Sequence, residues 1–285
     1  MTLCRISSPN PVIAPVSVII PCFRCANTIP RAVQSVATQT LKPLEIILVD
    51  DASPDDTRQV LFALQEEFGN SWLKIISLPS NFGPGAARNA GWDEAQGDYI
   101  AFLDADDAWH TRKIEIQYGW MHDHPNSAIT GHAAGFCGES PCNEEIIDTA
   151  RAFDVTSMML LLSNRLTTCS AMLRRGIAQR FLPEKRHMED HLLWLEITLS
   201  GKVITILDHT LCYLFKAPFG EAGLSGQMWQ MECAELANYR YLAARRLISW
   251  PAAFLLCIYS CLKYCRRLVM VSSRRLGSRL AAQLK

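Results

Sequence analysis

Short apolar runs alternate with segments of helical spacing over the first hundred residues of the chain. Each run is long enough for a strand that is covered on both faces. Between the runs, apolar residues recur every three or four positions, which is typical of a helix with one buried face. The alternation predicts βαβ units with right-handed crossovers and a mostly parallel sheet flanked by helices. The expected strands are residues 16–20, 44–49, 73–78 and 98–103. The expected helices are residues 29–39 and 57–68, and a third that follows a glycine-rich entry at residues 81–91 and runs to about residue 95.

The pattern is weaker after residue 109, but strands and helices continue to alternate. Asp154 or Thr156 can cap one helix and Gly201 can end another. The expected helices are residues 111–123, 156–163, 191–199 and 228–246, and the expected strands are residues 128–130, 168–173, 203–207 and 212–215. We therefore expect a flexible leader at residues 1–15, an α/β catalytic domain at residues 16–226 and a helical C-terminal region at residues 227–285.

Acidic side chains follow two of the predicted strands. Asp50 and Asp51 end the second strand, and Asp104, Asp106 and Asp107 end the fourth. Because side chains alternate along an extended chain, Asp104 and Asp106 can point the same way and share a cation. Carboxylate oxygens suit Mg²⁺ or Mn²⁺. The carboxyl ends of neighbouring parallel strands form one edge of a sheet, so these groups are expected to meet there. A solvated acidic turn is the alternative for this motif on its own.

A glycine-rich segment, residues 81–91, leads into the third predicted helix. Its Gly83-x-Gly85 pair resembles part of a dinucleotide-binding fingerprint. However, Arg88 stands where the third glycine is needed, and the motif follows the third strand rather than the first. The sequence therefore argues against a nicotinamide dinucleotide site.

Charge is distributed unevenly along the chain. The net charge is zero, yet residues 240–285 contain ten Lys and Arg residues and no Asp or Glu. The first 239 residues therefore carry about ten net negative charges, which argues against a catalytic domain that binds nucleic acid.

The eleven cysteines do not form an obvious disulfide framework. Their number is odd, and residues 1–14 have no continuous apolar signal segment. These features favour a reducing, cytoplasmic location. Cys22 and Cys25 form a lone CxxC without a second pair, so the pattern does not favour a zinc site.

Five motifs in order resemble the signatures of family 2 inverting glycosyltransferases. The resemblance covers roughly residues 15–215 and implies a GT-A fold, a nucleotide-diphosphate sugar donor and a divalent cation, Mn²⁺ or Mg²⁺. The motifs are Val16-Ser-Val-Ile-Ile-Pro21, Val49-Asp-Asp-Ala-Ser53, Gly83-Pro-Gly-Ala-Ala-Arg-Asn-Ala-Gly91, Phe102-Leu-Asp-Ala-Asp-Asp107, and Glu189-Asp190 with Trp194.

The resemblance also implies a role for individual residues. Asp51 resembles the residue that reads the nucleobase, and Pro21 lines the nucleoside pocket. Arg88 matches an arginine near the donor. Asp104 and Asp106 match the DxD element, with Asp106 the better candidate for direct metal ligation. The second residue of the Glu-Asp pair, Asp190, matches the catalytic base.

These roles agree with the chemistry of an inverting transfer. One carboxylate deprotonates an acceptor hydroxyl, which contributes on the order of 10²- to 10⁴-fold to the rate. A metal takes up the charge that develops on the leaving diphosphate. We expect transfer to a glycan or lipid-linked acceptor in cell-surface polysaccharide synthesis. The alternatives are a nucleotidyltransferase, which has no use for Asp190, and an inactive nucleotide-sugar-binding module of a membrane assembly.

One departure concerns the loop after the last strand. Many relatives carry a histidine there, whereas residues 213–226 contain none. Lys216 is a candidate electrostatic substitute. Three glycines at residues 220–226 suggest a mobile lid.

The C-terminal region combines apolar and basic residues. Residues 250–262 carry no charge, but a spanning helix needs about 20 apolar residues. The basic residues that follow suit a helix lying on the inner face of a membrane, with each cation contributing about 1 kcal/mol near anionic lipid. We expect peripheral membrane association. Docking of this helix on the catalytic domain is the alternative.

Overall fold

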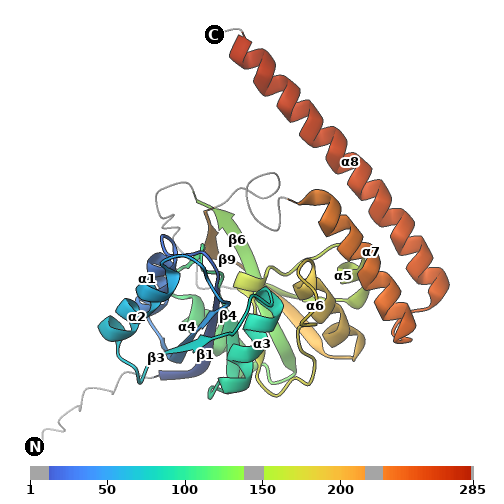
Figure 1. Ribbon diagram of the computed structural model, residues 1–285. Helices are drawn as coiled ribbons and strands as arrows, with labels where there is room; N and C mark the ends of the chain where they lie inside the picture. Colours follow the sequence, from blue (N-terminus) through green and yellow to red (C-terminus); the bar gives the residue numbers. More distant parts are fainter. Residues whose placement is uncertain (1–12, 138–150, 216–226, 284–285) are drawn as a thin grey trace, which may run out of the picture.

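The computed structural model describes residues 13–137, 151–215 and 227–283, with side chains up to residue 269. Nine described strands form one mixed sheet flanked by helices, with the order β3-β2-β1-β4-β8-β6-β9-β5 and with β7 paired to β9 (Figure 1). The expected α/β architecture, a central sheet flanked by helices with a C-terminal helical extension, is confirmed. The expected leader lies almost entirely outside the described residues, as do Lys216 and the glycine-rich lid segment.

The N-terminal half of the sheet matches the predicted βαβ series. Strands β3, β2, β1 and β4 lie side by side and are all parallel. Their bounds are β1 (Ile13–Cys22), β2 (Lys42–Asp50), β3 (Leu73–Ser77) and β4 (Tyr99–Phe102), and the helices between them are α1 (Ile29–Ala37), α2 (Thr57–Phe68) and α3 (Pro84–Glu94).

Both faces of β1, β2 and β4 are largely buried, because alternate side chains enter two separate cores, whereas β3 at the edge of the sheet is half-buried. Ile19 and Phe102 belong to one core, which also contains Trp92 and Trp194. Val18 belongs to the other core, on the side of α1 and α2. Helix α3 approaches the sheet closely at Gly91, where a Cβ atom would lie 2.6 Å from Ile19 Cγ2. This close approach fixes α3, and therefore Arg88, against the sheet.

The second half of the sheet is mixed, so the parallel pattern does not extend across it. β8 pairs antiparallel with both β4 and β6, β6 pairs parallel with β9, and β5 and β7 pair antiparallel with β9. The remaining elements are β5 (Ala108–Trp109), α4 (Lys113–Asp123), β6 (Ser127–Phe136), β7 (Ala152–Val155), α5 (Ser157–Leu162), β8 (Met172–Arg174), α6 (Glu189–Leu199) and β9 (Val203–Leu214).

Three predictions in this half were wrong in detail. The expected strand at residues 168–173 is a 3-10 turn, η1 (Thr168–Ser170), followed by the short β8. The two strands expected at residues 203–207 and 212–215 are one strand, β9, because β6 continues beside it through several register shifts. β5 and β7 were not predicted, since strands this short depend on a neighbour rather than on their own pattern.

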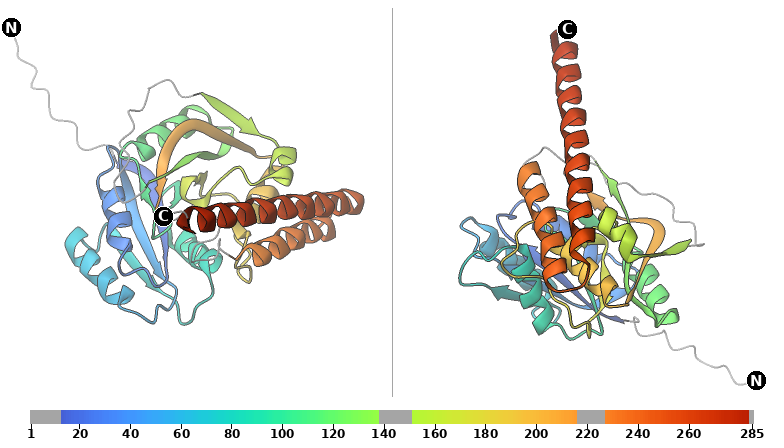
Figure 2. Two further views of the ribbon diagram at one scale, coloured as in Figure 1. Left: turned by 90° about the horizontal axis from the view of Figure 1, so that it is seen from above. Right: turned by 90° about the vertical axis from the view of Figure 1, so that its right-hand side faces the viewer.

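The C-terminal helices form an antiparallel pair, α7 (Met228–Ala244) and α8 (Trp250–Gln283), that packs beside α5 and α6 (Figures 1 and 2). Glu235 of α7 accepts a hydrogen bond from Lys263 at 2.7 Å, and Tyr239 donates to the carbonyl of Leu161 at 2.8 Å. Lys263 of α8 also donates to the carbonyl of Leu162 in α5 at 2.9 Å, so the first half of α8 is docked on the catalytic domain, as the alternative interpretation expected. Beyond α7, α8 continues away from the sheet (Figure 1). Among the described residues, no helix has the length and apolar character needed to cross a bilayer.

Candidate functional site

Three parallel strands bring the predicted donor residues to one edge of the sheet. β1 lies between β2 and β4, with Cys22 opposite Asp50 and Ile19 opposite Phe102. The amide of Asp51 donates a hydrogen bond to the carbonyl of Cys22, the residue after Pro21, at 2.9 Å. Pro21 near the end of β1, Asp51 after β2 and the acidic turn after β4 therefore lie at the same edge of the sheet.

Asp51 is buried and holds the glycine-rich segment in place. Its two carboxylate oxygens accept the amides of Phe82 and Gly83, each at 2.8 Å. Gly83 has φ of 94°, a conformation that favours glycine. Burial raises the pKa of Asp51, while the two amide hydrogen bonds act in the opposite direction. Because a carboxylate oxygen can accept two hydrogen bonds, Asp51 keeps acceptor capacity for a ligand.

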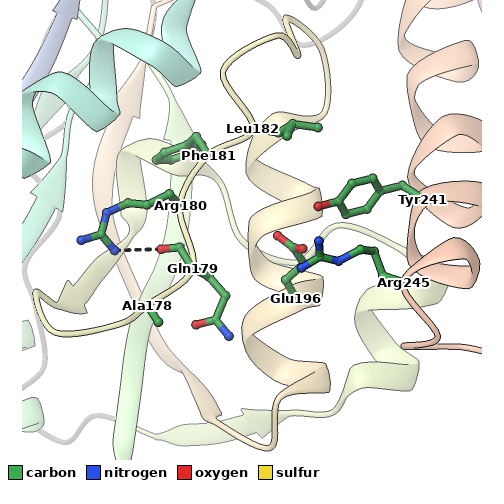
Figure 3. Close-up of a pocket in the computed structure, with 8 residues that line it drawn as sticks. All are labelled: Ala178, Gln179, Arg180, Phe181, Leu182, Glu196, Tyr241 and Arg245. Atoms are coloured by element: carbon green, nitrogen blue, oxygen red, sulfur yellow. Dashed lines mark hydrogen bonds between the residues drawn. The ribbon is translucent and has the colours of Figure 1, made fainter.

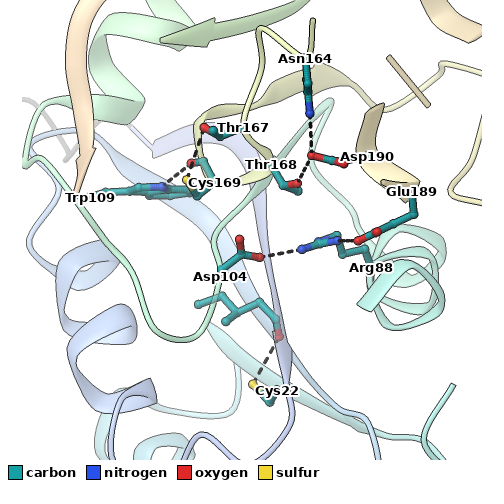
Figure 4. Close-up of polar contacts among 11 residues, drawn as sticks. Cys22, Arg88, Asp104, Trp109, Asn164, Thr167, Thr168, Cys169, Glu189 and Asp190 are labelled. Atoms are coloured by element: carbon teal, nitrogen blue, oxygen red, sulfur yellow. Dashed lines mark hydrogen bonds and ion pairs between the residues drawn. The ribbon is translucent and has the colours of Figure 1, made fainter. Parts of the chain in front are cut away.

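Arg88 of α3 connects the acidic turn to α6 (Figure 4). One terminal nitrogen lies 2.7 Å from Asp104 Oδ1, and the other lies 2.9 Å from Glu189 Oε1. Burial alone would lower the pKa of Arg88, but the two carboxylates outweigh it and raise the pKa above its ordinary value. Both terminal nitrogens of Arg88 are thus engaged by protein carboxylates, which makes this residue a bridge between two segments.

The acidic turn after β4 places its three carboxylates in different surroundings. Asp104 and Asp106 are half-buried, whereas Asp107 is 7% exposed. Burial, followed by the neighbouring charges of Asp104 and Asp106, raises the pKa of Asp107 to about 8. The amide of Asp107 closes the turn on the carbonyl of Asp104 at 3.1 Å. Two partly exposed carboxylates on one tight turn fit Mg²⁺ or Mn²⁺, which keep several water or phosphate ligands.

Asp190 lies in the first turn of α6, directly after the residue that Arg88 binds. Its Oδ2 accepts hydrogen bonds from Asn164 at 3.3 Å and from Thr168 at 3.2 Å, and its Oδ1 accepts the amide of His191 at 2.7 Å. The N-terminus of a helix favours a negative charge. The ion pairs of Arg88 with Asp104 and with Glu189 therefore connect the acidic turn to the start of α6, where Asp190 lies (Figure 4).

Glu189 differs from its neighbour Asp190 in burial. It is 8% exposed, and burial raises its pKa to about 7, although Arg88 acts to lower that pKa. Glu189 is therefore paired with Arg88, whereas the partners of Asp190 described above are the neutral side chains of Asn164 and Thr168 and a backbone amide.

Two residues that touch Asp190 were not singled out from the sequence, namely Asn164 and Thr168. They lie 26 and 22 positions before Asp190, in a segment expected to be a loop and a strand. The segment carries a dense group of hydroxyl and amide side chains at residues 163–170, which is the one signal that could have drawn attention to it. Their contact with Asp190 depends on the tertiary fold.

A separate pocket of about 440 Å³ opens between α6, α7 and the segment before α6 (Figure 3). Glu196 and Arg245 face each other across it, and burial raises the pKa of Glu196. Phe181 belongs to its wall and also lies under Arg88, 5.4 Å from ring centre to guanidinium carbon. None of the predicted donor or catalytic residues lines this pocket, whose residues are Ala178, Gln179, Arg180, Phe181, Leu182, Glu196, Tyr241 and Arg245.

Comparisons with known proteins agree with this geometry. Residues 17–181 match the profile of the family described as glycosyl transferase family 2. The chain is 30% identical over 202 residues to the Escherichia coli enzyme WfgD, named as a UDP-Glc:alpha-D-GlcNAc-diphosphoundecaprenol beta-1,3-glucosyltransferase, covering 70% of this chain and 76% of that one. It is 31% identical over 189 residues to Bacillus subtilis TuaG, whose name refers to teichuronic acid biosynthesis, covering 65% and 73% of the two chains.

Solved structures give the same fold. Residues 1–349 of S. aureus TarS in complex with UDP-GlcNAc superpose with a TM-score of 0.63 at 21% identity, covering 80% of this chain and 66% of that chain. The chain corresponds to 39% of a longer TarS structure. The mannosyltransferase PcManGT of Pyrobaculum calidifontis, in complex with GDP-Man and Mn²⁺, has a TM-score of 0.56 at 17% identity, covering 93% and 86%. On the family profile, the relatives and the shared fold together, the chain belongs to glycosyl transferase family 2.

Proposed function

We propose that this protein is an inverting glycosyltransferase that moves a sugar from a nucleotide-diphosphate sugar to a hydroxyl of a glycan or lipid-linked acceptor in cell-surface polysaccharide synthesis. The observation that carries the proposal is the series Asp104, Arg88, Glu189 and Asp190, which links a metal-type acidic turn to a separate carboxylate. An inverting displacement needs these two groups, one for the leaving diphosphate and one for the incoming alcohol.

In this proposal Asp106 and Asp104 hold the cation, Mn²⁺ or Mg²⁺. When bound, the cation supplies Lewis-acid stabilisation of the leaving diphosphate. Oxygen ligands suit either ion, and the related PcManGT structure contains Mn²⁺. Arg88 contributes by fixing the orientation of Asp104, and it lies close enough to the turn to affect donor binding through that carboxylate.

The nucleoside lies against Pro21 and Asp51 in this proposal. Pro21 is next to last in β1, and Asp51 directly follows β2, so both lie at the edge where the acidic turn begins. The acceptor capacity of Asp51 suits the N–H groups of a nucleobase. The solved TarS fragments contain UDP or UDP-GlcNAc, which makes uridine diphosphate donors the first to test.

Asp190 acts as the base. Its carboxylate removes the proton from the acceptor hydroxyl as the oxygen attacks the anomeric carbon, on the face opposite the diphosphate. Asn164, Thr168 and the amide of His191 fix the orientation of the carboxylate. A positioned carboxylate of this kind contributes on the order of 10²- to 10⁴-fold to the rate.

The test compares Asp106→Ala and Asp190→Ala with the wild-type protein, using a panel of nucleotide sugars with Mn²⁺ and Mg²⁺. We expect Asp106→Ala to lose metal-dependent donor binding. Asp190→Ala should bind the donor normally, with kcat lower by about 10²- to 10⁴-fold. Asp93→Ala, which changes a carboxylate with a side chain 72% exposed, serves as the matched control.

The same assays separate the two alternatives. A nucleotidyltransferase would release pyrophosphate from a nucleoside triphosphate, and its activity would not depend on Asp190. A binding module would show no turnover of any donor in the wild-type protein. Either result contradicts the proposal, and the expected split between the two alanine variants supports it.

We further propose that α8 places the enzyme at the cytoplasmic face of a membrane. Large apolar side chains on the outer side of α8 are exposed, among them Phe254 at 67%, Leu255 at 65% and Leu262 at 64%. Basic residues without acidic neighbours follow them in the sequence. Together these features suit a helix that lies in an anionic membrane interface.

The membrane proposal is tested with the triple variant Phe254→Ser, Leu255→Ser and Leu262→Ser. These exposed side chains can be changed without removing the docked contacts of α8. The wild-type protein should sediment with vesicles that contain phosphatidylglycerol, and the variant should remain in the supernatant. Phe62→Ser, at an exposed position of α2, is the control. Equal sedimentation of the triple variant and the wild type would refute this role for α8.

A further inference from the structure

A group of buried polar side chains next to the acidic turn has no part in the proposed transfer. Asp107 follows β4, Cys169 belongs to η1, and Cys212 belongs to β9. One ligand atom of each lies within 4.8 Å of the others. Their exposed fractions are 7%, 2% and 0%, so water does not solvate them freely. Three segments that are distant in sequence thus converge with one carboxylate and two thiols.

This set of donors fits zinc better than it fits the hard cation of a glycosyltransferase site. Zinc binds thiolate sulfur at about 2.3 Å and carboxylate oxygen at about 2.0–2.2 Å, usually with four ligands in a tetrahedron. Neighbouring ligand atoms are then about 3.3–3.8 Å apart, which lies within the observed limit. Magnesium prefers oxygen ligands alone, so the two thiols distinguish this group from Asp104 and Asp106.

A fully buried lysine provides a second, independent observation. Lys113 is 0% exposed, and its Nζ has no hydrogen-bond partner among the described residues. The Nζ lies 3.6 Å from the ring centre of Trp109 and interacts electrostatically with Cys212 and Cys169. A buried ammonium without a counter-charge is costly. Two thiolates, one carboxylate and one Zn²⁺ together carry a single negative charge, which Lys113 would neutralise.

We propose that Asp107, Cys169 and Cys212 bind one zinc ion, with Lys113 as the buried counter-charge. Binding requires the ionised forms of both thiols and of the Asp107 carboxyl, and the protons that these groups release go to solvent. The ion would fasten the acidic turn to η1 and to β9 and so fix the segment that carries Asp104 and Asp106. The proposal does not depend on the transferase mechanism, because a structural ion could serve any activity of this fold.

The test titrates the full-length, metal-free protein with Co²⁺ and records its absorption spectrum. Thiolate ligands give Co²⁺ a charge-transfer band in the near ultraviolet, whereas the oxygen ligands of Asp104 and Asp106 do not. We expect a band that saturates at about one equivalent of Co²⁺ and that Zn²⁺ abolishes by displacement. Absence of the band would overturn the proposal.

Variants identify the thiols. Cys169→Ser and Cys212→Ser should each weaken the band and lower the Co²⁺ affinity at least tenfold. Loss of a residue that only supports a metal ligand already costs about 10- to 100-fold in affinity, and loss of a ligand should cost no less. Cys233→Ser, at an exposed position of α7, is the matched control and should leave the titration unchanged. A band that disappears only in Cys22→Ser would place the ion at the CxxC pair and would overturn the assignment.

Two further measurements keep the test decisive if a cysteine variant fails to fold. Asp107→Asn keeps both thiols and should reduce both the Co²⁺ affinity and the zinc content of the purified protein, measured by mass spectrometry. Unchanged values would contradict the proposal. Thiol labelling of the unreduced, denatured wild-type protein should find Cys169 and Cys212 free. A disulfide between them would exclude a metal site.

Discussion

The acidic turn and the start of α6 carry the two halves of the proposed chemistry, and they are built in different ways. The acidic turn is one continuous segment, in which Asp104, Asp106 and Asp107 follow β4 directly. Asp190 instead receives hydrogen bonds from Asn164 and Thr168, which precede it by more than twenty residues. A local motif therefore defines the metal-type site, whereas the position of the base depends on several distant segments.

The support of α6 extends to the C-terminal helices. Met188, just before α6, has φ of 54°, a left-handed conformation that is uncommon for a residue with a side chain. Its carbonyl accepts a hydrogen bond from Asn238 of α7 at 3.1 Å. The docked part of the C-terminal region thus helps to hold the start of α6.

The strongest way to break the link between the two sites is Arg88→Met. This change leaves Glu189 buried without its cation, and breaking a buried pair costs about 3–5 kcal/mol. Because Asp104 keeps partial contact with solvent, we expect the lower end of that range. Urea unfolding measures the loss. Arg112→Met, which removes a surface pair with Glu115, should change stability by about 0–1 kcal/mol. Equal losses in the two variants would contradict the bridging role.

A second test uses Lys113→Met to ask whether the buried lysine near the acidic turn costs stability. Burial lowers the pKa of Lys113 from 10.5 to about 7. Between these values the unfolded chain binds more protons than the folded one, so the free energy of unfolding rises with pH. In the metal-free protein, the variant should be more stable at pH 7 by about 1–4 kcal/mol and should lose this rise with pH. Thermal unfolding from pH 6 to 10 tests both points, and an unchanged pH profile would show that Lys113 is not the cause.

The third test sharpens the view that distant residues position the base. Thr168→Val keeps the shape of the side chain but removes the hydroxyl that donates to Asp190. A hydrogen bond to a charged group contributes about 1.5–3 kcal/mol, which corresponds to a loss in kcat of about 10- to 100-fold. The KM for the donor should not change, because the hydroxyl of Thr168 contacts the base rather than the donor.

The control for this test is Thr38→Val, which changes the exposed residue at the C-terminal cap of α1. It should leave kcat and KM as they are in the wild-type protein. A Thr168→Val enzyme with normal kcat, or one whose defect lies only in KM, would show that Thr168 does not position Asp190.

Much of the N-terminal half was predictable because its signals are local. The apolar runs of β1, β2 and β4 are largely buried on both faces, so each run identifies its strand without knowledge of a partner. The order of strands and helices then leads to a parallel sheet with Asp51 and the acidic turn at its carboxyl edge. The second half was less predictable, because η1, β5 and β7 are short and take their conformation from neighbouring strands.

The sequence by itself determined the α/β character of the chain, the resemblance to its family and the identity of the acidic residues, because alternation and motif spacing are written into adjacent positions. Only the tertiary structure decided that Arg88 binds two protein carboxylates, that Asn164 and Thr168 contact Asp190, and that two thiols and a lysine gather beside Asp107. These contacts join residues far apart in the chain, and no local pattern records which distant side chains packing will bring together.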